Sequence, residues 1–367
     1  MDKESIEYSR KYPFVSVCTP TFNRRPFIPS MLACFNHQTY PKDRMEWIII
    51  DDGTDKIEDL VKEHPNVKYF KYDTKLTLGK KRNLLHKKSI GDIIVYMDDD
   101  DYYPPERVTH AVETLIKNKE ALCAGSSLLY IYFKHIQKMY QFGPYGPNHA
   151  TAGTFAFKRK LIENTKYDDT ACLAEERKFL KDYTVPFVQL DAMKTILVVS
   201  HEHNTYDKRK LLDNPHPDLV KVSDKKMEDF IKDDKLFNFF MNIDSLLDKY
   251  EPGSPTMKPD VLFQMVKIEE TRRKQAEDML RKSGGGGQIN MVGTDGKTIN
   301  LTNPQVVDII QNLQKTILHQ QQQLQHMKTS HETLLKENIK LQSQLSTQHA
   351  TSSDIQSTPN IDVIDIQ

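Results

Sequence analysis

The sequence predicts an α/β fold whose core is a largely parallel sheet flanked by helices, followed by a helical region and a coiled coil. Continuous apolar runs of strand length alternate with amphipathic stretches of helix length over the first half of the chain. Such runs are typical of strands that are buried on both faces of a sheet. Apolar residues at heptad spacing near the C-terminal end predict the coiled coil.

The expected elements follow one another as strand, helix, strand along the chain. Strands are expected at 14–18, 46–50, 67–72 and 93–97, and helices at 29–36, 56–63 and 78–89. Three of the strands end in polar residues, at 19–21, 51–52 and 98–101. Ligands of such sheets bind beyond the carboxyl ends of the strands, so these polar residues are expected to meet at one edge.

Composition divides the chain into five expected parts. These are an α/β domain at 1–215, a helical extension at 216–282, a Gly-rich linker at 283–303, a coiled coil at 304–346 and a disordered tail at 347–367. With Ile310 as heptad position a, eight of the eleven a and d positions up to Leu345 are apolar, and Asn338 occupies an a position. This pattern favours a homo-oligomer, either a dimer or a trimer. The alternative is a Gln-rich helix that packs on its own domain.

The overall composition argues against several classes of protein. The chain has 51 basic and 51 acidic side chains, so it has no global attraction to nucleic acid or anionic lipid. The N-terminal stretch is charged, and no apolar run approaches the roughly 20 residues of a spanning helix. The four cysteines lie far apart in the sequence and form no C-x-x-C pair. We therefore expect a cytoplasmic protein without signal peptide, membrane span, zinc cluster or disulfide framework.

Six motifs occur in a fixed order along the chain. They are VSVCTPTFNRR at 15–25, WIIIDDGTD at 47–55, LGKKRNLL at 78–85, GDIIVYMDDDDYYPP at 91–105, AEERKF at 174–179 and HEHNT at 201–205. Together they resemble the successive motifs of glycosyltransferase family 2, whose sheet has the GT-A fold and binds nucleotide sugars. The resemblance implies a hexosyltransferase that moves a sugar from a nucleoside diphosphate donor, UDP-linked by preference, to a hydroxyl of a glycan, protein or lipid acceptor.

The acidic turn at 98–101 is the sharpest candidate for a metal site. Four adjacent carboxylates repel one another unless a cation binds among them, and hard divalent cations take oxygen ligands. The resemblance places the family's D-x-D metal motif at Asp98 and Asp100, with Mn²⁺ or Mg²⁺ as the cofactor. It places His201 on the metal or beside the diphosphate, and His203 is the competing histidine. The alternative is a solvated acidic turn.

The resemblance also implies a set of donor-binding residues. These are Pro20, Thr21, Asp51, Asp52, Arg82 and Asp99. Asp52 would accept a hydrogen bond from the base, Asp51 would support Asp52 or contact the ribose, and Asp99 would reach the ribose. Arg82 would lie near the base and the phosphates. Strand termination, an Asp-Gly turn and a solvated basic helix face are the alternatives for these residues.

Glu176 is the candidate general base. A carboxylate must take the proton of the acceptor hydroxyl as that hydroxyl attacks the anomeric carbon, which predicts an inverting reaction. The family usually has Glu-Asp where this chain has Glu175 and Glu176, so Glu175 or Asp169 could act instead. The alternative is an ordinary acidic helix start.

Two other functions remain open at this stage. A nucleotidyltransferase that makes nucleotide sugars shares the sheet and the metal carboxylates, although it calls for a Gly-rich phosphate loop where this chain has TPTFNRR. A non-catalytic scaffold protein would keep a relic GT-A domain beside its coiled coil.

Overall fold

The computed structural model describes residues 2–173, 176–213, 215–282, 289–292 and 298–301, together with single helical positions between 305 and 327. The chain consists of two compact units, Met1–Ile268 and Glu269–Gln367, each described here by itself. Within the described residues, no helix is long and apolar enough to cross a membrane.

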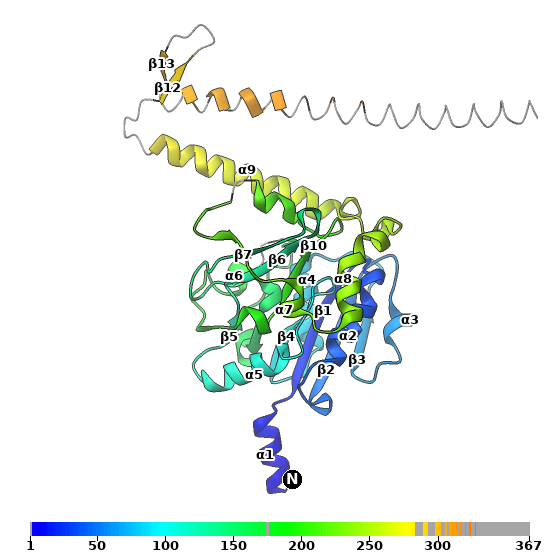
Figure 1. Ribbon diagram of the computed structural model, residues 1–367. Coiled ribbons are helices and arrows are strands. Elements are labelled where there is room, and N and C mark those ends of the chain that lie inside the picture. Colours follow the sequence, from blue (N-terminus) through cyan, green and yellow to red (C-terminus); the bar gives the residue numbers. More distant parts are fainter. Residues whose placement is uncertain are drawn as a thin grey trace, which may run out of the picture. The chain divides into compact units, whose positions relative to one another are not determined.

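A seven-stranded mixed sheet forms the centre of the first unit (Figure 1). Its spatial order is β3 (Val67–Lys71), β2 (Met45–Asp51), β1 (Val15–Thr21), β4 (Ile93–Tyr96), β8 (Ala156–Lys158), β5 (Cys123–Gly125) and β9 (Phe187–Gln189). The first four strands of this order pair in parallel, and β8 runs antiparallel to both β4 and β5. The predicted parallel α/β sheet is therefore present, with strand starts that differ by at most one residue and strand ends that differ by at most three.

Strand β1 extends past its predicted end and includes a proline. It runs to Thr21, and Pro20 pairs with Ile50 of β2. Its pairing with β4 on the other side stops at Cys18. Pro20 therefore lies where one neighbouring strand has already ended, which is the kind of position in which a sheet tolerates a missing N–H donor.

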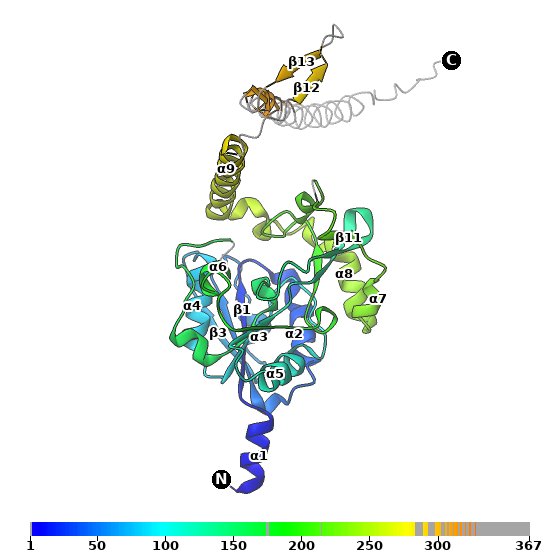
Figure 2. The same cartoon turned by 90° about the vertical axis from the view of Figure 1, so that its left-hand side faces the viewer.

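Helices cover both faces of the sheet because successive side chains of each strand point to opposite faces. The helices of the first unit are α1 (Lys3–Lys11), α2 (Ile28–Asn36), α3 (Glu58–Val61), α4 (Leu78–Lys88), α5 (Arg107–Lys117), α6 (Glu176–Phe179), α7 (Met227–Phe230), α8 (Asp234–Leu247) and the first part of α9 (Pro259–Lys282). Val15 and Val17 pack in one core with α2 and α5, whereas Cys18 packs in a second core with α4 and α6. Figure 2 shows α2 and α4 on opposite sides of β1.

Short 3-10 turns connect several of these elements. They are Arg25–Phe27, Lys42–Arg44, Lys134–Ile136, Ala152–Thr154, Arg159–Glu163, Ala192–Lys194, Lys208–Leu212, Glu251–Gly253 and Pro255–Met257. Two of these turns, Ala152–Thr154 and Lys208–Leu212, contribute residues to the cavity described below.

A second, four-stranded sheet has the order β10 (Leu197–Ser200), β6 (Leu129–Phe133), β7 (Lys138–Phe142) and β11 (Val220–Val222). Strand β11 pairs antiparallel with β7, and Phe240 of α8 is fully buried in the main core. The first unit therefore continues past residue 215, where composition placed the end of the α/β domain. The reason is that the charged stretch after 215 carries one short strand and an amphipathic helix with a buried apolar face.

The second unit contains an antiparallel hairpin of β12 (Ile289–Val292) and β13 (Thr298–Leu301). This hairpin falls inside 283–303, for which composition predicts a linker. The Gly run itself, at 284–287, lies outside the described residues. Ile310, Leu313, Ile317 and Met327 occupy helical positions with exposed side chains. The other heptad residues, Gln320 excepted, and the predicted tail lie outside the described residues, so the coiled coil stays a prediction.

Candidate active site

A cavity of about 490 Å³ opens at the carboxyl ends of β1 and β4. Its wall is built from the loop after β1, helix α4, the acidic turn after β4, the turn Ala152–Thr154, strand β10 and a segment just before α9. The predicted site residues among its lining are Pro20, Arg82, Asp98, Asp99, Asp100 and Glu176. The sequence predicts that the polar ends of the strands lie at one edge of the sheet, and this is confirmed for the ends of β1 and β4.

The carboxylates of the acidic turn have different surroundings and therefore different pKa values. Burial raises the pKa of Asp99 to about 7, against the opposing charge of Arg24. Burial also acts to raise the pKa of Asp100, but a hydrogen bond from His201 and the charge of Arg24 hold it well below its usual range. Burial and the neighbouring Asp100 raise the pKa of Asp101. Asp100 is thus strongly acidic, whereas Asp99 and Asp101 protonate more readily.

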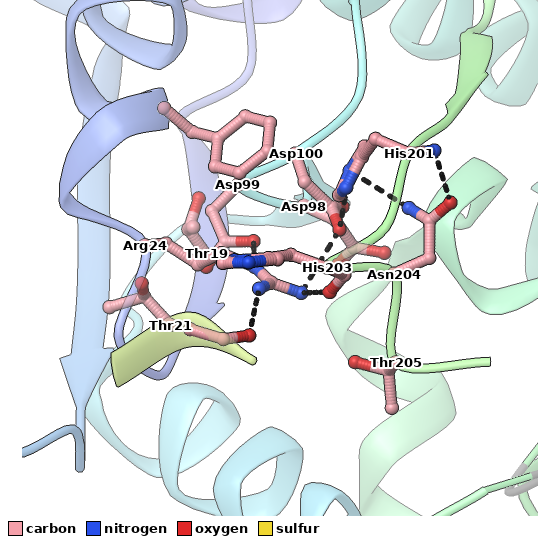
Figure 3. Close-up of polar contacts among 12 residues, drawn as sticks. Thr19, Thr21, Arg24, Asp98, Asp99, Asp100, His201, His203, Asn204 and Thr205 are labelled. Atoms are coloured by element: carbon pink, nitrogen blue, oxygen red, sulfur yellow. Dashed lines mark hydrogen bonds and ion pairs between the residues drawn. The ribbon is translucent and has the colours of Figure 1, made fainter. Parts of the chain in front are cut away.

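Arg24 is the cation that compensates this turn. Its Nε lies 3.5 Å from Oδ1 of Asp99, and its Nη2 lies 3.3 Å from Oδ2 of Asp100. Nη2 also donates to the carbonyl oxygen of His203 at 2.7 Å, as Figure 3 shows. The sequence analysis did not single out Arg24. The available signal was its place in TFNRR, directly after a strand that ends at the predicted site.

His201 reaches the same turn from the end of β10. Its Nε2 lies 3.5 Å from Oδ2 of Asp100 and 2.8 Å from Nδ2 of Asn204 (Figure 3). The backbone N–H of His201 donates to Oδ1 of Asn204, so this asparagine orients the histidine twice. Burial lowers the pKa of His201 to about 4, and the imidazole is therefore neutral near pH 7. A neutral imidazole is the form that binds metal ions.

The competing histidine, His203, takes a different role. Its carbonyl accepts from Arg24, and its ring lies near that of Tyr250, with 6.3 Å between centroids. Burial lowers the pKa of His203 to about 4 as well. Neither His203 nor His201 is among the residues that line the cavity.

Asp98 and Arg82 face each other across the cavity wall. Nη2 of Arg82 lies 3.6 Å from Oδ1 of Asp98, and its guanidinium stacks 4.5 Å from the centre of the Tyr96 ring. The backbone N–H of Asp98 donates to the hydroxyl oxygen of Tyr103 at 2.7 Å. A Cβ atom at position 153 would lie only 2.9 Å from Oδ2 of Asp98. The glycine found there avoids this clash with the carboxylate. Arg82 is therefore the residue of the basic helix α4 that pairs with the acidic turn.

The second predicted acidic pair, after β2, is turned inward. Asp51 accepts hydrogen bonds from the backbone N–H groups of Gly53 and Ile57 and from the hydroxyl of Tyr69. Asp52 forms an ion pair with Lys81 and accepts from the backbone N–H of Leu76.

Both aspartates are buried and neither lines the cavity. Thr21 is also buried, and its carbonyl accepts from Lys81 at 3.0 Å. Lys81 itself does line the cavity, and its contacts with Asp52 and Thr21 connect these two residues to the cavity wall.

Glu176, at the start of α6, lines the cavity together with the acidic turn. Its Oε1 accepts a hydrogen bond from the backbone N–H of Ala152 at 3.1 Å. Of the alternative bases, Glu175 lies outside the described residues. Asp169 accepts a hydrogen bond from Asn83 at 2.8 Å and does not line the cavity. Glu176 is therefore the described candidate that faces the acidic turn across open space.

The residues present fit a divalent cation. Asp100 and His201 bring an anionic oxygen and a neutral nitrogen within 3.5 Å of each other. Oδ1 of Asp101 is buried without a hydrogen-bond partner nearby. Within the part of the chain that the structure describes, no three His, Cys, Asp or Glu side chains form a ready-made metal site. A cation here would take its remaining ligands from a bound phosphate or from water, which is how Mg²⁺ commonly binds beside nucleotides.

The comparisons with known proteins agree with this geometry. Residues 16–183 match the family model described as Glycosyl transferase family 2. Poly(ribitol-phosphate) beta-N-acetylglucosaminyltransferase TarS of Staphylococcus aureus is 31% identical over 101 residues, which are 26% of this chain and 18% of that protein. Dolichyl N-acetyl-alpha-D-glucosaminyl phosphate 3-beta-D-2,3-diacetamido-2,3-dideoxy-beta-D-glucuronosyltransferase of Methanococcus voltae is 30% identical over 121 residues, which are 30% of this chain and 37% of that protein.

Solved structures of sugar transferases are also similar to this chain. TarS residues 1–349 of S. aureus in complex with UDP-GlcNAc has a TM-score of 0.40 at 19% identity, covering 52% of this chain and 59% of that chain. Mannosyltransferase PcManGT from Pyrobaculum calidifontis in complex with GDP-Man and Mn²⁺ has a TM-score of 0.43 at 14% identity, covering 63% and 70%. The chain spans less than half the length of the curated relatives named above. The sequence matches support a glycosyltransferase of family 2, with the matched region spanning the acidic turn and Glu176.

Proposed function

We propose that this protein is a metal-dependent, inverting glycosyltransferase with a GT-A fold. It transfers a hexose from a nucleoside diphosphate sugar, UDP-linked by preference, to an acceptor hydroxyl. The observation that carries the proposal is that the acidic turn at 98–101 and the carboxylate of Glu176 line one cavity of about 490 Å³. That volume lies within the range of small-ligand sites. The family match over residues 16–183 supports the same activity.

The donor would lie along the wall formed by Pro20, Arg82 and Asp99, which all line the cavity. Arg82 offers a guanidinium that is already oriented by Asp98 and by the Tyr96 ring. Asp52 would act on the donor through Lys81, because Lys81 is its ion-pair partner and lines the cavity. Asp51 and Thr21 would hold this part of the wall in place from behind.

Asp98, Asp100 and His201 would hold the divalent cation, and its charge would stabilise the diphosphate as it leaves. Glu176 would accept the proton of the acceptor hydroxyl on the other side of the sugar. The backbone N–H of Ala152 orients the Glu176 carboxylate by its 3.1 Å hydrogen bond. In-line attack by the hydroxyl inverts the anomeric carbon, and no covalent sugar–enzyme bond forms.

The first test is the release of nucleoside diphosphate from a panel of nucleotide sugars with Mn²⁺ by the full chain. Release from one donor, with inverted configuration in the product, supports the transferase. Turnover that depends on added pyrophosphate would support a nucleotidyltransferase instead. Silence with every donor and acceptor would favour a non-catalytic scaffold protein.

We further propose that the C-terminal heptads join two or more copies of the chain. Ile310, Leu313, Ile317 and Met327 lie at a and d positions, and each exposes between 44% and 61% of its surface within the described residues. Apolar side chains at heptad spacing gain stability when another helix covers them. A second copy supplies an identical stripe.

A further inference from the structure

A segment far beyond the family match completes one wall of the cavity. It comprises residues 250–264, called here the crossing segment, and it lies within the first unit. Its first part binds the loop after β1. Nδ2 of Asn23 donates to the carbonyl oxygen of Pro252 at 2.8 Å, and Nη1 of Arg24 donates to that of Gly253 at 3.3 Å. These two hydrogen bonds attach the crossing segment to Asn23 and to Arg24, the arginine that pairs with the acidic turn.

The second part of the crossing segment is attached to other residues around the cavity. Asp260 forms an ion pair of 2.5 Å with Lys75. Oε1 of Gln264 accepts from the backbone N–H groups of Cys172 and Leu173 at 2.6 and 2.9 Å. Because Arg24, Lys75, Cys172 and Leu173 all line the cavity, the crossing segment is attached to the cavity lining at two places.

Lys258 is the charged residue that the crossing segment places in the cavity lining between these two attachments. It is only 6% exposed, and its Nζ donates to Oγ1 of Thr205 at 2.8 Å. No carboxylate of the described residues lies within ion-pair distance of it. By contrast, Lys81 is paired with Asp52. Burial and the neighbouring Arg24 lower the pKa of Lys258 well below its usual range.

A buried ammonium with one neutral partner is unfavourable by itself, because removing a charge from water costs several kcal/mol unless a counter-charge compensates it. Asp99 and Asp100 favour the charged form of Lys258 through their negative charge, but both already pair with Arg24. Among the described residues, the lining of this cavity of about 490 Å³ therefore includes a buried cation that has no direct ion-pair partner.

We propose that Lys258 binds the diphosphate of the nucleotide donor, so that the crossing segment is part of the donor site. This inference rests on the proposed function for the identity of the anion. Lysine suits the role because its ammonium acts as a compact point charge on phosphate oxygens. One cation of the donor site, beside Arg82, would thus come from a residue that lies outside the matched region of the chain.

The test measures binding by calorimetry on the full chain with Mn²⁺, using UDP, uridine and sodium pyrophosphate as ligands. In Lys258→Met, the affinity for UDP and pyrophosphate should fall by about tenfold or more, as expected for the loss of a charge-assisted contact. The affinity for uridine should stay within about twofold, which also shows that the variant is folded. Lys249→Met, which removes an exposed lysine just before the crossing segment, is the matched control.

A second readout is the melting temperature without ligand. Lys258→Met should melt at or above the wild-type temperature, because it removes a buried charge without a counter-charge. A much lower melting temperature would show a structural lysine and overturn the inference, as would unchanged UDP and pyrophosphate affinity. If pyrophosphate bound in a Lys258-dependent way and UDP did not bind at all, the anion site at Lys258 would be supported. The proposal that the donor is UDP-linked would be wrong. Binding of neither ligand by the wild type would overturn both proposals.

Discussion

Nη2 of Arg24 lies 3.3 Å from Oδ2 of Asp100, and both side chains line the cavity. The same guanidinium also reaches Asp99, so one arginine compensates two adjacent carboxylates. Ion pairs therefore connect the loop after β1 with the turn after β4 at the edge of the sheet. This relationship couples the stability of the first unit to the chemistry of its site.

Replacing Arg24 by Met should lower the free energy of unfolding by about 3 kcal/mol or more, because two buried carboxylates lose their counter-charge. The deficit should shrink at lower pH. Arg24 lowers the pKa of Asp99 and Asp100, so without it these carboxyls take up protons at higher pH. Urea unfolding at pH 7.5 and 5.5, followed by the fluorescence of the single tryptophan, Trp47, measures both effects.

The control for that prediction is Arg177→Met. Arg177 pairs with Asp182 at 2.6 Å, but both side chains are more than two-thirds exposed, at 73% and 71%. Exposed pairs contribute roughly 0–1 kcal/mol, so this variant should be close to wild type. Equal losses in the two variants would show that the buried arrangement around Arg24 has no special importance for stability.

Asp100→Asn should abolish sugar transfer and leave the fold intact. The substitution keeps the shape of the side chain but removes the anionic oxygen that lies 3.5 Å from His201. The expected signature is loss of Mn²⁺-dependent stabilisation by the donor in a thermal-shift assay, together with loss of turnover. Asp224→Asn, at an exposed position, is the control. Near-normal activity of Asp100→Asn would remove the metal role from this residue.

Glu176→Gln should separate donor binding from transfer. The glutamine can still accept the hydrogen bond from Ala152, but it cannot take a proton from the acceptor. We expect an unchanged dissociation constant for UDP and a kcat lower by about 10²- to 10⁴-fold. Glu113→Gln on the exposed face of α5 is the control. Retained transfer would shift the base to a neighbouring carboxylate.

The contribution of His201 to stability should fall as pH falls through the acidic range, because His201 is buried in its neutral form. Its pKa is lowered from 6.5 to about 4 in the folded chain, whereas the unfolded chain binds the proton near 6.5. Between these values the unfolded state binds more protons, so the free energy of unfolding decreases by up to about 3 kcal/mol as pH drops.

Asp99 contributes in the opposite direction, since its pKa is raised from 3.8 to about 7. A pH series of urea unfolding on the wild type therefore reports the sum of these two groups and of the other groups with shifted pKa values, such as His203 and His86. Comparison with His201→Gln isolates the histidine, and His135→Gln at an exposed position serves as the control. If the wild type and His201→Gln had parallel pH profiles, the histidine would not be the group that titrates.

Ile317→Lys should weaken self-association of the full chain. It places a charge at heptad position a, where an apolar side chain that is 52% exposed in the single chain would be covered by another copy. Analytical ultracentrifugation should show a shift toward monomer. Asn312→Lys, at an outward heptad position of the same helix, should leave the mass unchanged. A wild-type chain that is monomeric at micromolar concentration would rule out the proposed oligomer.

The sequence by itself determined the parallel half of the main sheet and the position of the acidic turn. Both follow from local information, because an apolar run such as Ile93–Tyr96 is long enough for one buried strand and the residue after it must lie at the sheet edge. The same reasoning placed Asp98 and Asp100 at that edge, whereas Glu176 was expected at the site only from the resemblance to glycosyltransferase family 2. All three residues line one cavity.

Tertiary structure alone decided which of the polar residues face that cavity. Asp51 and Asp52 look alike in the sequence to the aspartates of the turn, but backbone N–H groups of Ile57 and Leu76 and the ammonium of Lys81 turn them inward. These hydrogen-bond and ion-pair partners come together only when the loops fold. The sequence pattern around Asp51 and Asp52 therefore does not reveal them.

The same holds for the cations. Arg24 and Lys258 are separated by more than two hundred positions, yet both line one cavity because the crossing segment returns to the loop after β1. Charge interactions act through space and not along the chain. The composition of a lysine-rich stretch could therefore not reveal which lysine would become buried.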